Sequence, residues 1–157
     1  MTARRETELY QPIRRYLERR GYTVHGEVNG CDLVARLEEE LLVVELKRSF
    51  SLKLLAQAVE RQAYADGVYV AVAVDSATAY PPNYRQIRPL LRRLGLGLLI
   101  VRFLKRGSRV ELVFHPGAYE PPRRRKKRGA VIREIEGRIV DAGVGGRASA
   151  SGPQLTA

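Results

Sequence analysis

Asp32, Glu45 and Lys47 are the three residues whose types and spacing best suit chemistry. Asp32 lies in the apolar run 31–35, and Glu45 and Lys47 end the apolar run 42–47. Because side chains alternate along a strand, Glu45 and Lys47 point to the same face. Carboxylates are hard oxygen ligands for Mg²⁺, and a lysine ammonium can stabilise negative charge that develops on a phosphate. These residues therefore predict a site for a divalent metal ion and a phosphodiester.

Lys47 is unusual in this chain because most of the positive charge is carried by arginine. Only 5 of the 28 basic residues are lysine. Arginine is a planar fork that keeps its proton, whereas lysine is a compact cation that can hold or orient a water molecule. We therefore interpret Lys47 as the residue that assists an attacking water.

The face on which Asp32 lies depends on the turn that joins its strand to the next one. Asp32 and Glu45 share a face if the loop has an even number of residues, such as Glu38-Glu39 or Glu39-Glu40. A three-residue loop, Glu38 to Glu40, separates them, because one step of register moves every side chain to the other face. The sequence leaves both arrangements open.

The surrounding elements alternate between helical and strand periodicity, which indicates an α/β protein. The run 67–74 is apolar throughout, as in a strand that is covered on both faces. We expect a central mixed sheet of four to five strands with helices on both faces. The pattern predicts helices at 4–20, 51–64 and 83–94, and strands at 22–28, 31–37, 41–47, 67–74, 98–104 and 109–114.

Asn29-Gly30 between two strand patterns is a strong signal for a hairpin with a type I′ turn. With a two-residue loop, Glu27 lies directly opposite Asp32, with the two Cβ atoms about 5 Å apart. Two like charges repel at this separation, and a bound cation removes the repulsion. Glu27 is therefore a further candidate metal ligand. The alternative is a pair of exposed carboxylates that point apart into solvent.

The charge of the chain points to a polyanionic partner. The 157 residues carry a net charge of +11 and a pI near 10.3, and clustered basic residues bind phosphates. The alternative to a polyanionic partner is that the arginine-rich composition serves solubility or reflects genome bias. Six consecutive basic residues, 123–128, follow a pair of prolines. We divide the chain into a domain at 1–120 and an appendage at 121–157, which contains a basic linker, a short helix and a tail expected to be disordered.

The sequence shows no pattern for an internal disulfide, a signal peptide or a membrane span, and this indicates where in the cell we expect the protein. The single cysteine, Cys31, cannot form an internal disulfide. The first residues lead into a charged amphipathic helix rather than a signal peptide, and no apolar stretch has the roughly 20 residues of a membrane span. We expect a cytoplasmic protein that does not enter a membrane.

The order of elements and acids resembles the PD-(D/E)XK nuclease superfamily. Four segments carry the resemblance: Glu6 in the first helix, Gly30-Cys31-Asp32, Glu45-Leu46-Lys47, and Gln57 in the following helix. Several short segments of the chain are also similar to the sequences of an uncharacterised bacterial family of predicted PD-(D/E)XK phosphodiesterases. Cys31 stands where the superfamily pattern has proline, a departure that affects no ligand.

The resemblance implies a restriction-endonuclease-like fold and a Mg²⁺-dependent phosphodiesterase, with Mn²⁺ as an alternative ion. Asp32, Glu45 and the backbone carbonyl of Leu46 are implied to hold the metal, and Lys47 to assist the attacking water. Glu6 and Gln57 are implied to face the site, although Glu8 could take the place of Glu6. The implied substrate is nucleic acid, DNA in the first instance, and the resemblance leaves a homodimer open.

Each of these residues also has a structural interpretation. Asp32 could cap the hairpin turn, Glu45 and Lys47 could form an exposed ion pair, and Glu6 could complement a helix dipole. Gln57 could be a surface amide. For the whole chain, the rivals to an enzyme are a non-catalytic nucleic-acid-binding protein with the same fold and a small adaptor whose basic tail docks an acidic protein.

Overall fold

A computed structural model describes residues 6–142 of the chain, with side chains described up to Arg138. The expected tail at 143–157 lies outside the described residues. Contacts divide the chain after Glu120 into two units. This division coincides with the boundary expected from composition. The assignment of the first unit as a nuclease-like domain stays a prediction.

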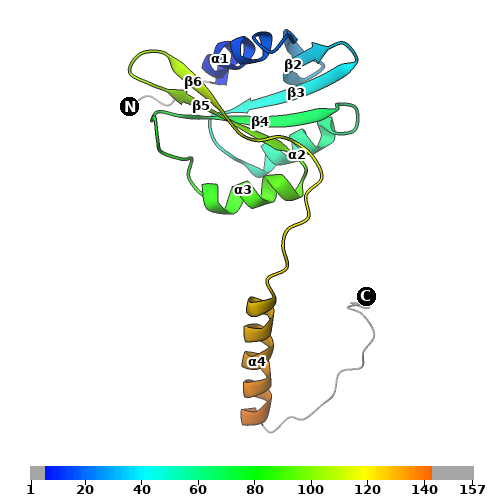
Figure 1. Cartoon of the computed structure of the whole chain (residues 1–157), viewed down its shortest axis with the longest axis vertical. Helices are drawn as coiled ribbons and strands as arrows, with labels where there is room; N and C mark the ends of the chain where they lie inside the picture. Colours follow the sequence, from blue (N-terminus) through cyan, green and yellow to red (C-terminus); the bar gives the residue numbers. More distant parts are fainter. Residues whose placement is uncertain (1–5, 143–157) are drawn as a thin grey trace. The chain divides into compact units, whose positions relative to one another are not determined.

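The first unit contains three helices and a six-stranded sheet (Figure 1). In the sheet, the strands are ordered as in the sequence. The elements of this unit are α1 (Glu6–Glu18), β1 (Thr23–Val28), β2 (Cys31–Leu37), β3 (Glu40–Lys47), α2 (Leu52–Arg61), β4 (Gly67–Val74), α3 (Tyr84–Arg93), β5 (Gly97–Phe103) and β6 (Ser108–Phe114).

The sheet is mixed, as expected. β3, β4 and β5 are parallel and are connected through α2 and α3, whereas β1–β2, β2–β3 and β5–β6 pair antiparallel. The α/β class is confirmed, and the arrangement is compatible with a restriction-endonuclease-like fold. The expected count of four to five strands was too low, because both strands of the last hairpin join the sheet: β5 pairs with β4, and β6 pairs with β5.

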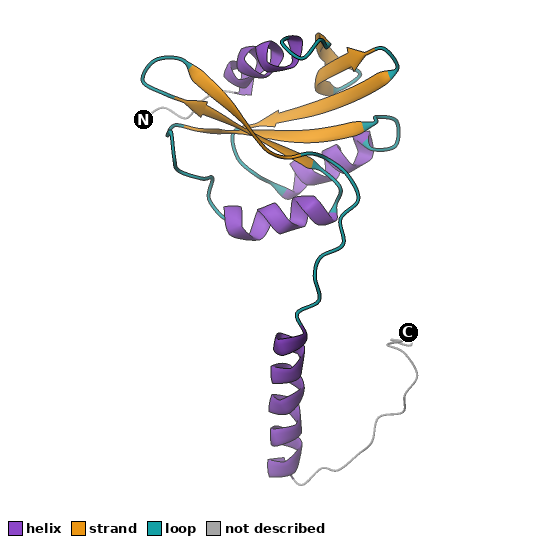
Figure 2. Ribbon diagram, viewed as in Figure 1, coloured by secondary structure: helices purple, strands orange, loops and turns teal. Residues whose placement is uncertain are grey.

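Two hydrophobic layers form on opposite faces of the sheet, with α1 on one face and α2 and α3 on the other (Figure 2). On α1, Leu9 and Ile13 are fully buried against residues such as Val44. On α2, Leu54 and Ala58 are fully buried on the other face. β3 alternates between the two layers, because even-numbered residues from 42 to 46 face α1 and Val43 faces α2 and α3.

Two tight turns fix the register of the first three strands. Asn29 and Gly30 both have positive φ, 47° and 79°, and Val28 pairs with Cys31, which confirms the expected type I′ turn. Leu37 pairs with Glu40, so the second loop contains two residues, Glu38 and Glu39. This is the even-numbered alternative, in which Asp32 and Glu45 occupy facing positions.

The residues before α2 and α3 are both of types that favour helix N-caps, but only the residue before α2 caps its helix with its side chain. Ser51 caps α2, since its Oγ accepts a hydrogen bond from the Leu54 amide at 3.1 Å. Asn83 precedes α3 in a left-handed conformation with φ of 62°, and its side chain makes no capping bond. Asn83 therefore serves the turn after Pro82 through its backbone.

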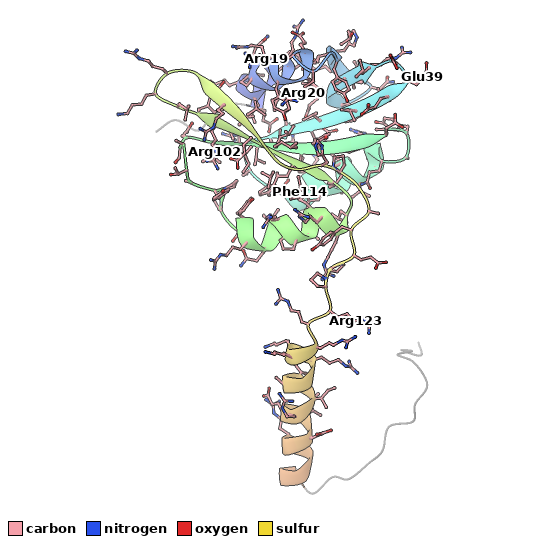
Figure 3. All side chains as sticks on the ribbon, viewed as in Figure 1. Arg19, Arg20, Glu39, Arg102, Phe114 and Arg123 are labelled. Carbon is pink, nitrogen blue, oxygen red and sulfur yellow. The ribbon has the colours of Figure 1, made fainter. Side chains whose placement is uncertain are left out.

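Arg102 is a buried cation within β5 and holds the segment before α3 in place (Figure 3). It is 2% exposed, and its Nε donates to Glu111 Oε2 at 2.7 Å. Its Nη1 donates to the carbonyls of Ser76 and Ala79. The segment 75–83 is thus fastened to β5 and β6 by side-chain hydrogen bonds rather than by a strand.

The second unit contains α4 (Arg125–Ala142). The helix begins inside the basic run, so four of the six consecutive basic residues are helical rather than part of a linker. Arginine and lysine are good helix formers, and the last proline before them is Pro122. Within residues 6–142, no helix combines the length and the apolar character that crossing a membrane requires.

Candidate metal and phosphodiester site

The candidate site lies where β2 begins and β3 ends. Leu33 pairs with Val44, and the same register continued by one residue places Asp32 opposite Glu45. The two carboxyl groups lie close enough for Asp32 to raise the pKa of Glu45, after the larger effect of burial. The two acids that were predicted from the sequence are therefore brought together, because the β2–β3 turn has an even number of residues.

Asp32 is oriented by the backbone of the neighbouring strand. Its Oδ2 accepts a 2.8 Å hydrogen bond from the amide of Leu46. The carboxylate is thus directed at β3 and away from the Asn29-Gly30 turn, so the turn-capping alternative for Asp32 does not describe this geometry. A carboxylate that is fixed by a backbone amide keeps its remaining oxygen available in a defined direction.

Glu45 is the most deeply buried acid of this group, with 2% of its surface exposed. Burial raises the pKa of Glu45, and the neighbouring Asp32 raises it further, whereas Arg61 acts in the opposite direction. Two carboxyl groups this close cannot both be ionised without a compensating charge. The pair therefore needs a proton, a metal ion or a basic side chain.

Arg61 supplies one such charge. Its Nε lies 3.0 Å from Glu45 Oε1, and its Nη2 donates to the carbonyl of Gly30 at 3.1 Å. Arg61 thus ties α2 to both the acid pair and the hairpin turn. Its spacing of four residues from Gln57 was the available signal, and it did not reveal the contact with Glu45.

Lys47 and Glu6 form a second pair. Lys47 Nζ lies 3.4 Å from Glu6 Oε2, and both side chains are partly exposed. The ion pair expected as an alternative, between Glu45 and Lys47, does not form, because each has another partner. Although Glu45 and Lys47 occupy positions of the same parity, Glu45 contacts α2 and Lys47 contacts α1 from the end of the strand.

Glu6 rather than Glu8 faces the site. Glu6 lines an open cavity of about 520 Å³, whereas Glu8 lines a different one beside the β5–β6 hairpin. Asp32 contributes to the wall of the larger cavity, together with Leu46. The complete lining of that cavity is Glu6, Thr7, Tyr10, Gly26, Glu27, Asp32 and Leu46.

Glu27 lies on the same cavity but does not complete a cluster of metal ligands. Within residues 6–142, no three His, Cys, Asp or Glu side chains gather closely enough to hold a metal ion. Glu27 has a positive φ of 50°, and neither it nor Asp32 appears as a regular ladder pair, although their neighbours pair in the expected register. The predicted role of Glu27 as a ligand therefore stays a prediction.

Tyr10 and Gln57 complete the surroundings. The ring of Tyr10 packs on Gly26 so closely that a Cβ at that position would lie 2.9 Å from Tyr10 Cε2. Tyr10 was missed at the sequence level, because its place in the helical stripe resembles that of an ordinary core residue. Gln57 is half-buried on α2, one helical turn before Arg61, on the side of the helix that approaches Glu45.

The chemistry of the donor set fits a divalent cation. Asp32 and Glu45 together carry two negative charges when ionised, and Arg61 offsets one of them. Hard carboxylate oxygens on neighbouring strands, next to an open cavity, match the preference of Mg²⁺ for one or two carboxylates with water and phosphate as further ligands. The raised pKa of Glu45 reflects the same excess of negative charge in a buried place.

Residues 99–157 match the profile of a protein family described as "Putative PD-(D/E)XK phosphodiesterase (DUF2161)". This similarity confirms the resemblance to the PD-(D/E)XK superfamily. The matched segment begins in β5 and therefore follows Asp32, Glu45 and Lys47 in the chain, so it does not test their roles. No curated protein matches the chain.

Proposed function

We propose that this chain is a metal-dependent phosphodiesterase that hydrolyses nucleic acid, with DNA as the first substrate to test. The observation that carries the proposal is the placement of Asp32 opposite Glu45 on neighbouring strands, with Asp32 lining an open cavity. The similarity of residues 99–157 to a phosphodiesterase family and the net charge of +11 support it.

Asp32, Glu45 and the backbone carbonyl of Leu46 are the proposed holders of Mg²⁺ or Mn²⁺. The ion would supply a Lewis acid that offsets negative charge on the phosphoryl oxygens. The chain itself fixes Asp32 through the Leu46 amide and keeps Glu45 in place through Arg61. Cation binding also removes the repulsion between the two carboxylates.

Lys47 is the proposed donor to the attacking water and to the phosphate. In hydrolysis, the water oxygen bonds to phosphorus and gives up a proton to solvent, while the bond from phosphorus to one sugar oxygen breaks. The leaving sugar oxygen takes up a proton from solvent. Negative charge grows on the phosphoryl group, and the proposed role of Lys47 is to stabilise it. The contact of Lys47 with Glu6, which lines the cavity, supports this role. Glu6 accepts a hydrogen bond from Lys47 and so positions the ammonium.

A non-catalytic nucleic-acid-binding protein is the second candidate. The observation in its favour is that Arg61 already offsets the charge of Glu45, so the acid pair has a partial substitute for a cation. In that case the fold and the basic surface bind nucleic acid without cleaving it.

Metal-dependent cleavage distinguishes the two candidates. Supercoiled plasmid and short duplex DNA are incubated with the full chain in Mg²⁺, Mn²⁺ or EDTA. The Asp32→Asn and Lys47→Ala variants are expected to lose cleavage by about 100-fold or more. Lys53→Ala, which removes an exposed lysine of α2, is the matched control and should cleave normally. Equal cleavage by all four proteins, or no cleavage with either metal, rejects hydrolysis.

A further inference from the structure

A second, arginine-rich groove lies beside α1. It is an open cavity of about 320 Å³ between α1 and the start of β6. Figure 3 labels Arg19 and Arg20, which lie in the turn directly after α1. The residues that line the groove are Pro12, Arg15, Tyr16, Arg19, Arg20, Ser108, Arg109 and Val110.

Four arginines line this groove without an acid beside them: Arg15, Arg19, Arg20 and Arg109. No Asp or Glu is among the described residues that line it. Arg15 and Arg19 are exposed, and neither side chain has an ion-pair partner within residues 6–142. By contrast, the nearby Arg14 is paired with Glu18 at 2.6 Å. Like charges that line one groove repel one another, and a bound anion relieves this repulsion.

The other two arginines are held in fixed positions. The Arg20 guanidinium lies over the Tyr16 ring, 3.5 Å from its centroid, and donates to the Tyr16 carbonyl. Arg109 donates to the carbonyl of Ala77 at 2.9 Å. Cations that are already ordered lose less conformational entropy when they bind a ligand, and the groove is therefore preorganised on two of its sides.

The basic surface extends beyond the groove and is longer than a surface that binds a single phosphate group needs to be. A neighbouring cavity of about 430 Å³ shares Pro12, Arg15 and Ser108 with the groove and is also lined by Lys105. Glu8 is the one acid among the described residues that line this neighbouring cavity. A planar guanidinium fork matches phosphate oxygens, and a row of such forks matches a polymer of phosphates.

We propose that this groove binds the phosphate backbone of DNA at a distance from the cleavage site. The inference rests on the proposed function, because it assigns a second contact for the same substrate. Thr7 in α1 lines the site cavity, and Arg19, which directly follows α1, lines the groove. The Arg19 amide still donates to the Arg15 carbonyl, so helical spacing separates the two residues by about 18 Å along the helix axis. At about 3.4 Å per nucleotide, this distance corresponds to about five nucleotides.

Binding to a 20-base-pair duplex, measured by fluorescence anisotropy in EDTA at several salt concentrations, tests the proposal without cleavage. The groove variant is Arg15→Gln with Arg19→Gln. The matched control is Arg85→Gln with Arg88→Gln, which removes the same charge from exposed positions of α3, on the other face of the sheet. Melting temperatures establish that both variants fold.

The groove variant is expected to weaken binding by at least about tenfold at 0.1 M salt and to lower the slope of log K against log salt by about two. The control should change binding much less.

Equal effects of the two double variants overturn the groove assignment, as does competition by polyglutamate as strong as that by unlabelled DNA. If the groove variant loses binding while wild type never cleaves DNA, the groove stands and the proposed hydrolysis fails. If wild type cleaves but the groove variant binds normally, the hydrolysis stands and the groove assignment fails.

Discussion

Arg61 Nε and Glu45 Oε1 are 3.0 Å apart, in a place where Glu45 is 2% exposed. The guanidinium is therefore the protein's own countercharge for a carboxyl group that also lies beside Asp32. A metal ion at the same acids would take over part of this role. Arg61 therefore stabilises the metal-free protein by offsetting the same negative charge that a bound cation would offset.

Removal of Arg61 should destabilise the metal-free protein and increase its response to metal. Arg61→Gln leaves a buried acid pair without its cation, and a loss of about 2–3 kcal/mol in the free energy of unfolding is expected in EDTA. Mn²⁺ should then raise the melting temperature of the variant more than that of wild type. Arg61→Lys is the control and should lie between them. A smaller metal response in Arg61→Gln contradicts the account.

Divalent metal should stabilise wild type through the acid pair. Binding to the folded state alone adds about 2.7 kcal/mol when the ion is present at 100 times its Kd. Thermal unfolding in EDTA, Mg²⁺, Mn²⁺ and Ca²⁺ measures this effect. Asp32→Asn should abolish it, whereas Glu60→Gln, at an exposed acid of α2, should retain it. A shift of equal size in all three proteins would place the ion elsewhere.

The acid pair should also make stability depend on pH in the absence of metal. Burial raises the pKa of Glu45 above its usual 4.5, so the folded protein holds this proton to a higher pH than the unfolded chain. The stabilising contribution is present below pH 4.5 and is lost as the pH rises through the folded pKa.

Urea unfolding in EDTA at stepped pH tests this direction. Glu45→Gln removes the titration, so its free energy of unfolding should fall less than that of wild type as the pH rises above 4.5. Glu39→Gln, in the exposed β2–β3 turn, should follow wild type. Parallel curves for wild type and Glu45→Gln would count against the raised pKa.

Gly26→Ala tests the packing of the cavity wall. The added Cβ meets Tyr10 Cε2 at 2.9 Å, which requires the ring to move. A loss of about 1–2 kcal/mol in the free energy of unfolding is expected from this overpacking. In a Tyr10→Ala background the same change should cost clearly less, since the ring is gone. Additive effects of the two substitutions would show that the contact does not form.

Arg102→Met should be the most destabilising of the substitutions considered. The substitution leaves the Glu111 carboxylate without its ion-pair partner and two backbone carbonyls without their donor. The expected loss in the free energy of unfolding is about 3–5 kcal/mol. Chemical unfolding measures the change. Arg106→Met, which removes an exposed arginine of the β5–β6 hairpin, should change stability by less than about 0.5 kcal/mol. Similar losses in both would remove the anchoring role of Arg102.

Features that depend on local geometry could be predicted from the sequence. Asn29-Gly30 defined the first hairpin because both residues tolerate positive φ, and the apolar run 67–74 indicated a strand that is covered on both faces. The proximity of Asp32 and Glu45 depended on whether the loop between their strands has an even number of residues, and the sequence alone did not determine this number.

Features that depend on how helices lie across the sheet could not be predicted. Arg61 reaches Glu45 only because α2 packs on that face, and Lys47 reaches Glu6 around the end of β3. Arg102 lies in an apolar strand, where its carbonyl partners come from a segment more than 20 residues earlier in the chain. Periodicity carries no information about contacts of this range.

The two-residue turn at Glu38-Glu39 limits how relatives of this chain can diverge. A single insertion there would invert β2 relative to β3, which would turn Leu33 and Ala35 out of the layer beneath α1 and carry Asp32 away from Glu45. Insertions of two residues would preserve both. Among descendants of this sequence, the length of this loop should therefore vary in even steps, although neither glutamate touches the site.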